Sequence, residues 1–220
     1  MEINLYFIRD HVATLTIAGL STLAICAAAL VIGAAMGALL CCMRMSRIGA
    51  LNKVSSIVID SLRSIPELVL IFWLYSCLPL VTYFSLTSLQ TGILSLSLIA
   101  AAYLAEIFRA GINGVHVGQP EAGFALGLTR FQTLRLIIAP QAARMMISPF
   151  LNFLCDLIKI STLLSALSLP ELAYKASVLA SNTYRYLEIY TIVGAFYFLV
   201  IFTLSTIARS YERRLLEIKT

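Results

Sequence analysis

The chain of 220 residues carries 60 % hydrophobic and 12 % charged residues, with a net charge of +5 and a mean hydropathy of +0.91. Soluble domains carry about 25 % charged residues, so this composition excludes an ordinary soluble protein. It indicates an integral membrane protein, and its length suits a single domain spanning residues 1–220. The five cysteines lie in or beside apolar runs without metal-ligand spacing, so we expect reduced thiols and no metal site.

Five stretches are long and apolar enough to cross a bilayer, which takes roughly 20 mostly apolar residues per helix. Their length and continuity favour helices over a barrel. In chain order they cover residues 15–42, 56–79, 86–108, 145–164 and 187–208. In the first stretch, Gly33 and Gly37 share one helix face and favour close approach of a neighbouring helix.

Basic residues gather after the first, third and fifth stretches: Arg44, Arg47, Lys53; Arg109, Arg130, Arg135, Arg144; Arg209, Arg213, Arg214, Lys219. The opposite segments hold only Arg9, Lys175 and Arg185. The positive-inside rule therefore predicts an N-terminus outside and a C-terminus in the cytoplasm, which agrees with an odd number of spans. Topology and anionic lipid account for the cations, so we expect no nucleic-acid partner.

The predicted cytoplasmic loop, residues 109–144, is longer than a bare connection requires. Within it, Pro120 suits a first helical position, and Glu121 is favoured in a first turn. Three small residues would give this short helix a thin side: Ala122, Gly123 and Gly127. Two interior glycines cost about 1 kcal/mol each relative to alanine, so the pattern predicts close docking against another backbone. An ordinary helix lying under the bilayer is the alternative.

The same residues resemble the EAA loop of permease subunits in ATP-binding-cassette importers. That pattern is Glu-Ala-Ala, three residues, Gly, nine residues, Ile, one residue, Leu-Pro. This chain matches it with two departures, Gly123 for the third Ala and Ala139 for the Leu. The runs "AAYLAEIFRAGINGVHVGQPEAGFALGL", "SLRSIPELVLIF" and "DLIKISTLL" are similar to the polar amino acid branch of the family, and the resemblance covers about residues 14–210.

The resemblance implies an all-α permease with five transmembrane helices and a cytoplasmic coupling helix, the type I importer fold. It implies a bacterial inner-membrane protein that binds two ATPase subunits, a second identical or sister permease, and a solute-binding protein near residues 169–186. ATP and Mg²⁺ would be held by the ATPases, with no cofactor on this chain. The expected coupling residues are Gln119, Glu121, Ala122, Gly123, Gly127 and Pro140.

Charged residues inside the predicted spans are costly and point to function. Asp60, Arg63 and Glu67 are spaced to share one helical face, which Pro66 would kink. One interpretation is internal pairing: Asp60–Arg63, Glu106–Arg109 and Asp156–Lys159. The other is a polar cavity in which Glu67 and Glu106 contact a cationic group of the substrate and Arg63 meets an α-carboxylate. The candidate substrate-binding residues are Glu67, Glu106, Arg63, Asp156 and Tyr103.

These patterns predict transport and disfavour an enzyme. The chain has no Gly-rich phosphate loop and no His-Glu-x-x-His helix, so we expect no ATP hydrolysis and no catalytic residues of its own. We expect the permease of an importer for polar amino acids, most of all basic ones such as arginine, histidine or lysine. Glutamine and glutamate remain open, as do homodimer and heterodimer. The alternative is a secondary transporter or channel subunit for a small polar solute.

Overall fold

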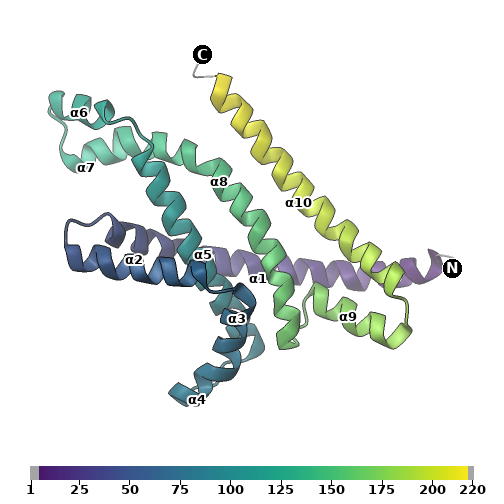
Figure 1. The fold of residues 1–220 in the computed structure, drawn as a ribbon. Helices are drawn as coiled ribbons and strands as arrows, with labels where there is room; N and C mark the ends of the chain where they lie inside the picture. Colours follow the sequence, from purple (N-terminus) through teal and green to yellow (C-terminus); the bar gives the residue numbers. More distant parts are fainter. Residues whose placement is uncertain (1–4, 218–220) are drawn as a thin grey trace.

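The structure, a computed structural model, describes the backbone of residues 5–217 and the side chains of residues 9–212. All regular secondary structure in this part of the chain is helical, as the sequence predicted (Figure 1). Its α-helices are α1 (Leu5–Arg44), α2 (Gly49–Ser64), α3 (Glu67–Phe72), α4 (Leu78–Thr82), α5 (Ser88–Asn113), α6 (Gly118–Ala125), α7 (Arg130–Thr133), α8 (Ala139–Ile160), α9 (Leu172–Thr183) and α10 (Tyr186–Glu217). Three further turns join them: the π-helical η1 (Trp73–Cys77) and η2 (Leu134–Ile138), and the 3₁₀-helical η3 (Ser161–Leu167).

Four of the described helical segments are long and apolar enough to cross a membrane: residues 9–44, 88–113, 130–167 and 186–212. A fifth crossing is present if the bent pair 49–64 and 67–82 counts as one span. The long helices lie across one another, with α6 and α7 beyond one end of α5 and α8, and α4 projecting at another (Figure 1).

The second predicted span is not one kinked helix. Its two halves meet at 104°, so α3 leaves the direction of α2 almost at a right angle. Ile65 has extended backbone, with a ψ of 129°, because proline disfavours helical geometry in the residue before it. Pro66 follows with a ψ of 133°, which is also non-helical. The prediction that Asp60, Arg63 and Glu67 share one helical face is therefore wrong, since Glu67 begins a new helix.

The two glycines of α1 allow it to pack closely along α5. A Cβ on Gly33 would lie 2.5 Å from the Ala100 Cβ, and one on Gly37 would lie 3.1 Å from the Leu104 Cβ. The predicted close approach is confirmed. Gly33 meets Ala100 and Gly37 meets Leu104, so the residue numbers increase in the same direction along both helices and α1 and α5 are parallel. The chain between them must therefore cross back to the side on which α1 began. The bent α2–α4 segment therefore occupies the place of one crossing.

The fourth predicted span starts earlier than expected, because the helix is continuous from Arg130 to Leu167. Thr129 caps it: its hydroxyl accepts from the Gln132 N–H, and the Gln132 side chain accepts from the Thr129 N–H. The sequence analysis placed this start near residue 145. The π turn η2 ends two residues before Pro140, and the wider turn accommodates the missing proline N–H without ending the helix.

The main core lies where α1, α5 and α8 meet. Leu96, Ala100 and Leu104 of α5 are fully buried there, together with Leu157 of α8. α8 runs against α5, and side-chain hydrogen bonds join α8 to α10 along their lengths. This core holds α5 and α8 side by side and so positions the polar side chains that they carry.

Candidate functional site

A small pocket of about 280 Å³ lies between the start of α3, the middle of α5 and the second half of α8. The pocket is smaller than the roughly 300–1,000 Å³ of drug-sized ligand sites, which suits a ligand of amino-acid size. Its lining residues are Glu67, Tyr103, Phe153, Asp156, Lys159 and Ile160. The structure thus brings together three of the five predicted substrate residues: Glu67, Tyr103 and Asp156.

The fold supplies each wall of this pocket from a different helix. Glu67 is the first residue of α3, directly after the sharp bend at Pro66. Tyr103 comes from α5, and its ring stacks on Phe153 of α8 with centroids 5.3 Å apart and planes at 19°. Phe153 was missed by the sequence analysis, because an aromatic residue in an apolar span gives no signal beyond core packing.

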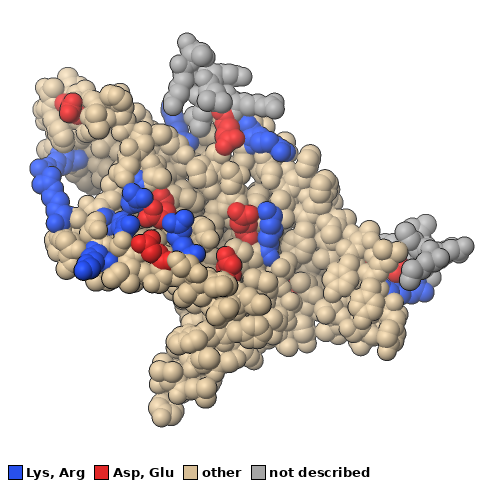
Figure 2. Space-filling view, in the orientation of Figure 1, with Lys and Arg blue, Asp and Glu red and all other residues tan. Residues whose placement is uncertain are grey.

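Asp156 and Lys159 form the predicted ion pair on the α8 wall. Lys159 Nζ donates to Asp156 Oδ1 over 3.0 Å, which confirms the internal pairing. Both side chains are nevertheless exposed, with 61 % of the Asp156 surface and 56 % of the Lys159 surface accessible. Charges of a spanning helix that face hydrocarbon are costly, so this face must look onto water or another polypeptide. Figure 2 shows acidic and basic side chains gathered on one face where α2, α5 and α8 meet.

Arg63 lies beside the pocket without lining it. Its guanidinium carbon is 5.3 Å from the centroid of the Tyr103 ring, a cation–π contact. The predicted Asp60–Arg63 pair is not formed; the Asp60 carboxylate instead accepts from the Ser56 hydroxyl over 3.4 Å. Within the described side chains, neither Arg63 nor Glu67 has an ion-pair partner.

Glu106 lies outside the pocket, in an ion cluster one turn further along α5. Arg109 donates to it through Nε (3.1 Å to each oxygen) and Nη2 (2.6 Å to Oε2), as the pairing interpretation predicted. Arg44, at the end of α1, adds a 3.9 Å contact that the sequence analysis missed. The parallel register of α1 and α5 brings these residues together, and their cluster links the ends of both helices.

The predicted coupling helix is present as α6, but one of its glycines has a different role. Gly127 lies beyond the end of α6 with a φ of 77°, in the left-handed region. Its N–H donates to the Phe124 carbonyl and the Leu128 N–H to the Gly123 carbonyl, which is the Schellman ending of a helix. The prediction that Gly127 contributes to a thin helix side is wrong. Pro120 also sits two residues inside the observed start.

The thin side of α6 faces its own chain. Gly123 is buried, and a Cβ there would lie 2.9 Å from Ile137 Cδ1 and 3.0 Å from Thr133 Cγ2. Gln119 accepts a hydrogen bond from Gln141 Nε2 over 3.0 Å, which also fixes α6 to the start of α8.

The surface left open on and around α6 is largely apolar. It comprises Val117, Glu121, Ala122, Phe124 and Leu126, of which Leu126 is 79 % exposed. Pro140 is exposed as well, near the start of α8. Any partner that docks here therefore meets this side of α6 and not the glycine.

Glu171, which the sequence analysis did not select, is a fully buried carboxylate at the start of α9. It accepts from the N–H groups of Ala173 and Tyr174 at 2.9 and 2.7 Å, and from the Thr22 hydroxyl of α1 at 3.3 Å. The same hydroxyl accepts from the Leu172 N–H. Burial raises the pKa of the Glu171 carboxyl, against the opposing effect of these hydrogen bonds. The residue ties α9 to α1.

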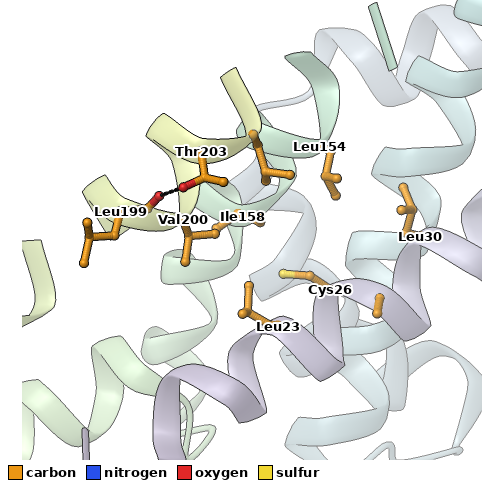
Figure 3. A pocket seen from close by; sticks show the side chains of 10 residues that line it. Leu23, Cys26, Leu30, Leu154, Ile158, Leu199, Val200 and Thr203 are labelled. Atoms are coloured by element: carbon orange, nitrogen blue, oxygen red, sulfur yellow. Dashed lines mark hydrogen bonds between the residues drawn. The ribbon is translucent and has the colours of Figure 1, made fainter. Parts of the chain in front are cut away.

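A larger pocket of about 590 Å³ lies between α1, α8 and α10 and is lined by apolar side chains (Figure 3). Leu23, Leu154 and Leu199 contribute from the three helices, and the Thr203 hydroxyl there donates back to the Leu199 carbonyl over 2.7 Å. With its one hydroxyl donor already used, this pocket is unsuited to a polar ligand, and the smaller charged pocket is the candidate site.

Comparison with known proteins places the chain in a family. The family described as "Binding-protein-dependent transport system inner membrane component" matches residues 29–217. The chain belongs to this family. It is 35 % identical to the probable amino-acid permease protein YxeN of Bacillus subtilis (strain 168), over 87 % of both chains. It is 32 % identical to the glutamine transport system permease protein GlnP of Escherichia coli (strain K12), over 74 % of this chain and 75 % of that one.

Solved structures share the fold. A crystal structure of an amino acid ABC transporter with histidines superposes with a TM-score of 0.88 and 32 % identity, over 97 % of this chain and all of that one. The inward-facing MetNI methionine ABC transporter gives a TM-score of 0.70 at 22 % identity, over 95 % and 99 % of the two chains. The chain is thus an all-helical membrane permease with the fold of type I ABC importer permeases.

Proposed function

We propose that this chain is the permease subunit of an ATP-driven importer for polar amino acids, with a basic amino acid as the preferred substrate. The observation that carries the proposal is the pocket between α3, α5 and α8. It offers carboxylates, an ammonium group and an aromatic wall, which suit a small zwitterion. The family membership and the amino-acid permeases among its relatives support the importer assignment.

Glu67 supports a basic substrate. Asp156 is neutralised by Lys159, and Glu106 by two arginines, so neither presents a free negative charge. Glu67 has no cationic partner among the described side chains and lines the pocket. An unpaired carboxylate that lines a pocket between apolar helices is best matched by a substrate cation.

The proposed mechanism uses two permease subunits, identical or sister, in a bacterial inner membrane, with the N-terminus outside. A solute-binding protein docks near residues 169–186 and delivers the amino acid. ATP binding closes two partner ATPases, which also hold the Mg²⁺, and the open surface of α6 transmits this motion to the spans. The chain, acting as a single domain, supplies two accessible states of one path, and ATP supplies the energy.

Crosslinking tests the coupling surface. Ala122→Cys and Phe124→Cys lie on the open side of α6, and Val178→Cys, on the exposed side of α9, is the matched control. In membranes that contain the whole complex, we expect the first two to crosslink to an ATPase and the control to fail. Crosslinks from α6 only to lipid would refute the coupling role.

Transport tests the alternative, a secondary transporter or channel. Liposomes that contain the purified complex, with its ATPase subunits facing the lumen, should accumulate radiolabelled amino acid only when the lumen contains ATP. Uptake by the chain alone, driven by a proton or sodium gradient, would overturn the importer assignment.

A further inference from the structure

The charged pocket between α3, α5 and α8 holds two separate sets of charged groups, and their separate roles in amino-acid recognition rest on the proposed function. We propose that the Asp156–Lys159 pair binds the α-ammonium and α-carboxylate common to all amino acids, while Glu67 selects the charge of the side chain. Each group comes from a different place in the fold, α8 for the pair and α3 for Glu67.

The geometry of the α8 pair matches a zwitterion. The α-ammonium and α-carboxylate are attached to one carbon, so their binding groups must be an acceptor and a donor that lie close together. Asp156 Oδ1 and Lys159 Nζ are 3.0 Å apart on one helix face, and both line the pocket. A zwitterion that enters exchanges this single ion pair for two, with Asp156 accepting from its ammonium and Lys159 donating to its carboxylate.

The pair is also available for this exchange. More than half of each side chain is exposed, and exposed pairs at i, i+3 spacing contribute little stability, so opening one costs little. Arg63, the other candidate for the carboxylate, is directed at the Tyr103 ring and does not line the pocket. The structure therefore assigns the carboxylate to Lys159 and not to Arg63.

Glu67 is suited to bind the substrate side chain, because it comes from a different helix than the Asp156–Lys159 pair and its charge is not neutralised. It has no basic partner among the described side chains, so it adds a net negative charge to an otherwise balanced pocket. The stacked rings of Tyr103 and Phe153 supply an apolar surface on which the methylene chain of arginine or lysine can lie. A neutral side chain would leave the Glu67 carboxylate uncompensated.

Three ligands separate the two roles. L-arginine carries all the groups, L-citrulline replaces the guanidinium with a neutral urea of the same shape, and agmatine lacks only the α-carboxylate. Direct binding to the permease–ATPase complex in lipid nanodiscs, without the solute-binding protein, excludes the selectivity of that protein. Wild type should bind arginine at least tenfold more tightly than citrulline, as expected for a lost charge-assisted contact.

Variants of the three charged residues should differ in which of the three ligands they bind more weakly. Glu67→Gln should weaken arginine binding about tenfold or more and leave citrulline unchanged, which abolishes discrimination. Lys159→Met should weaken arginine and citrulline equally and leave agmatine unchanged, and Asp156→Asn should weaken all three. Lys53→Met, an exposed lysine of α2 outside the pocket, is the matched control and should change none of them.

The outcomes distinguish the two levels of the proposal. If no amino acid binds wild type and none is taken up with ATP, the proposed function fails. If uptake occurs but Glu67→Gln weakens arginine and citrulline equally, or Lys159→Met affects agmatine as much as arginine, the division of roles is wrong. Glu67→Asp, which keeps the charge, should retain the arginine preference; its loss there would also overturn the assignment of Glu67. Size-exclusion profiles identify any variant that misfolds.

Discussion

The contact between α1 and α5 gives a quantitative prediction for Gly33→Ala. The new Cβ would lie 2.5 Å from the Ala100 Cβ and 2.9 Å from the Ser97 carbonyl oxygen. Carbon atoms pack at about 3.5–4.0 Å, so the two helices must separate by roughly 1 Å. Neither neighbour can rotate away, because one is an alanine methyl group and the other is backbone. Overpacking of this kind costs about 1–3 kcal/mol, and the gain of replacing glycine within a helix offsets up to about 1 kcal/mol.

The expected net loss is therefore about 1 kcal/mol, which corresponds to a fall in Tm of roughly 2–4 °C for a chain of this size. Gly194→Ala is the matched control, since Gly194 also lies inside a long helix and a Cβ there meets no described atom within 4 Å. The Tm of Gly194→Ala should stay constant or rise by up to roughly 2–4 °C, because alanine is favoured over glycine within a helix by up to about 1 kcal/mol. Thermal denaturation of purified protein in one detergent measures both. A Gly33→Ala variant as stable as Gly194→Ala would refute the close packing of α1 on α5.

Two further predictions concern the ends of helices. Burial raises the pKa of Glu171, so its contribution to stability is full below the ordinary glutamate pKa of about 4.3 and is lost as pH rises through the raised value. The Tm of wild type should therefore fall relative to Glu171→Gln between pH 4 and pH 8; a constant difference would contradict a buried, titrating carboxyl. Gly127→Ala places a side chain at a φ of 77°, which costs about 1–2 kcal/mol, so hydrogen exchange at the Leu128 amide should be roughly 5–30 times faster. Gly49→Ala, where a Cβ meets no described atom within 4 Å, should leave exchange at Leu128 unchanged.

The helical fold and most spans could be predicted from the sequence, because long apolar runs leave few alternatives in a membrane. Local hydrophobicity did not reveal the direction change at Ile65 and Pro66. A proline inside an apolar run is compatible with a kink or with a full break, and only the packing of α3 beside α5 selects the break. The early start of the fourth span could not be predicted for a related reason, since charges such as Arg130 and Arg135 are equally compatible with a loop.

The candidate site was predictable in part. Charged residues in apolar runs pointed to Glu67 and Asp156, and spacing alone gave the Asp156–Lys159 pair. The pairing of Glu106 with Arg109 could be predicted from their spacing, but the contact with Arg44 could not, because Arg44 lies far away in sequence and reaches Glu106 only through the parallel packing of α1 and α5. The burial of Glu171 could not be predicted from local sequence, because the helix that covers it, α1, contributes Thr22 from 149 residues away.

The position of Gly123 has a consequence for how such chains diverge. Since this residue meets Thr133 and Ile137 of its own chain, its size is matched to an internal neighbour and is hidden from any ATPase. Chains with a bulkier residue at this place should compensate with a smaller one at the positions of Thr133 or Ile137. If the exposed side of α6 meets the ATPase as proposed above, substitutions at Ala122 or Phe124 should instead vary together with the sequence of that partner. Under the coupling role proposed above, exchange of ATPases between transport systems would depend on the outer side of α6.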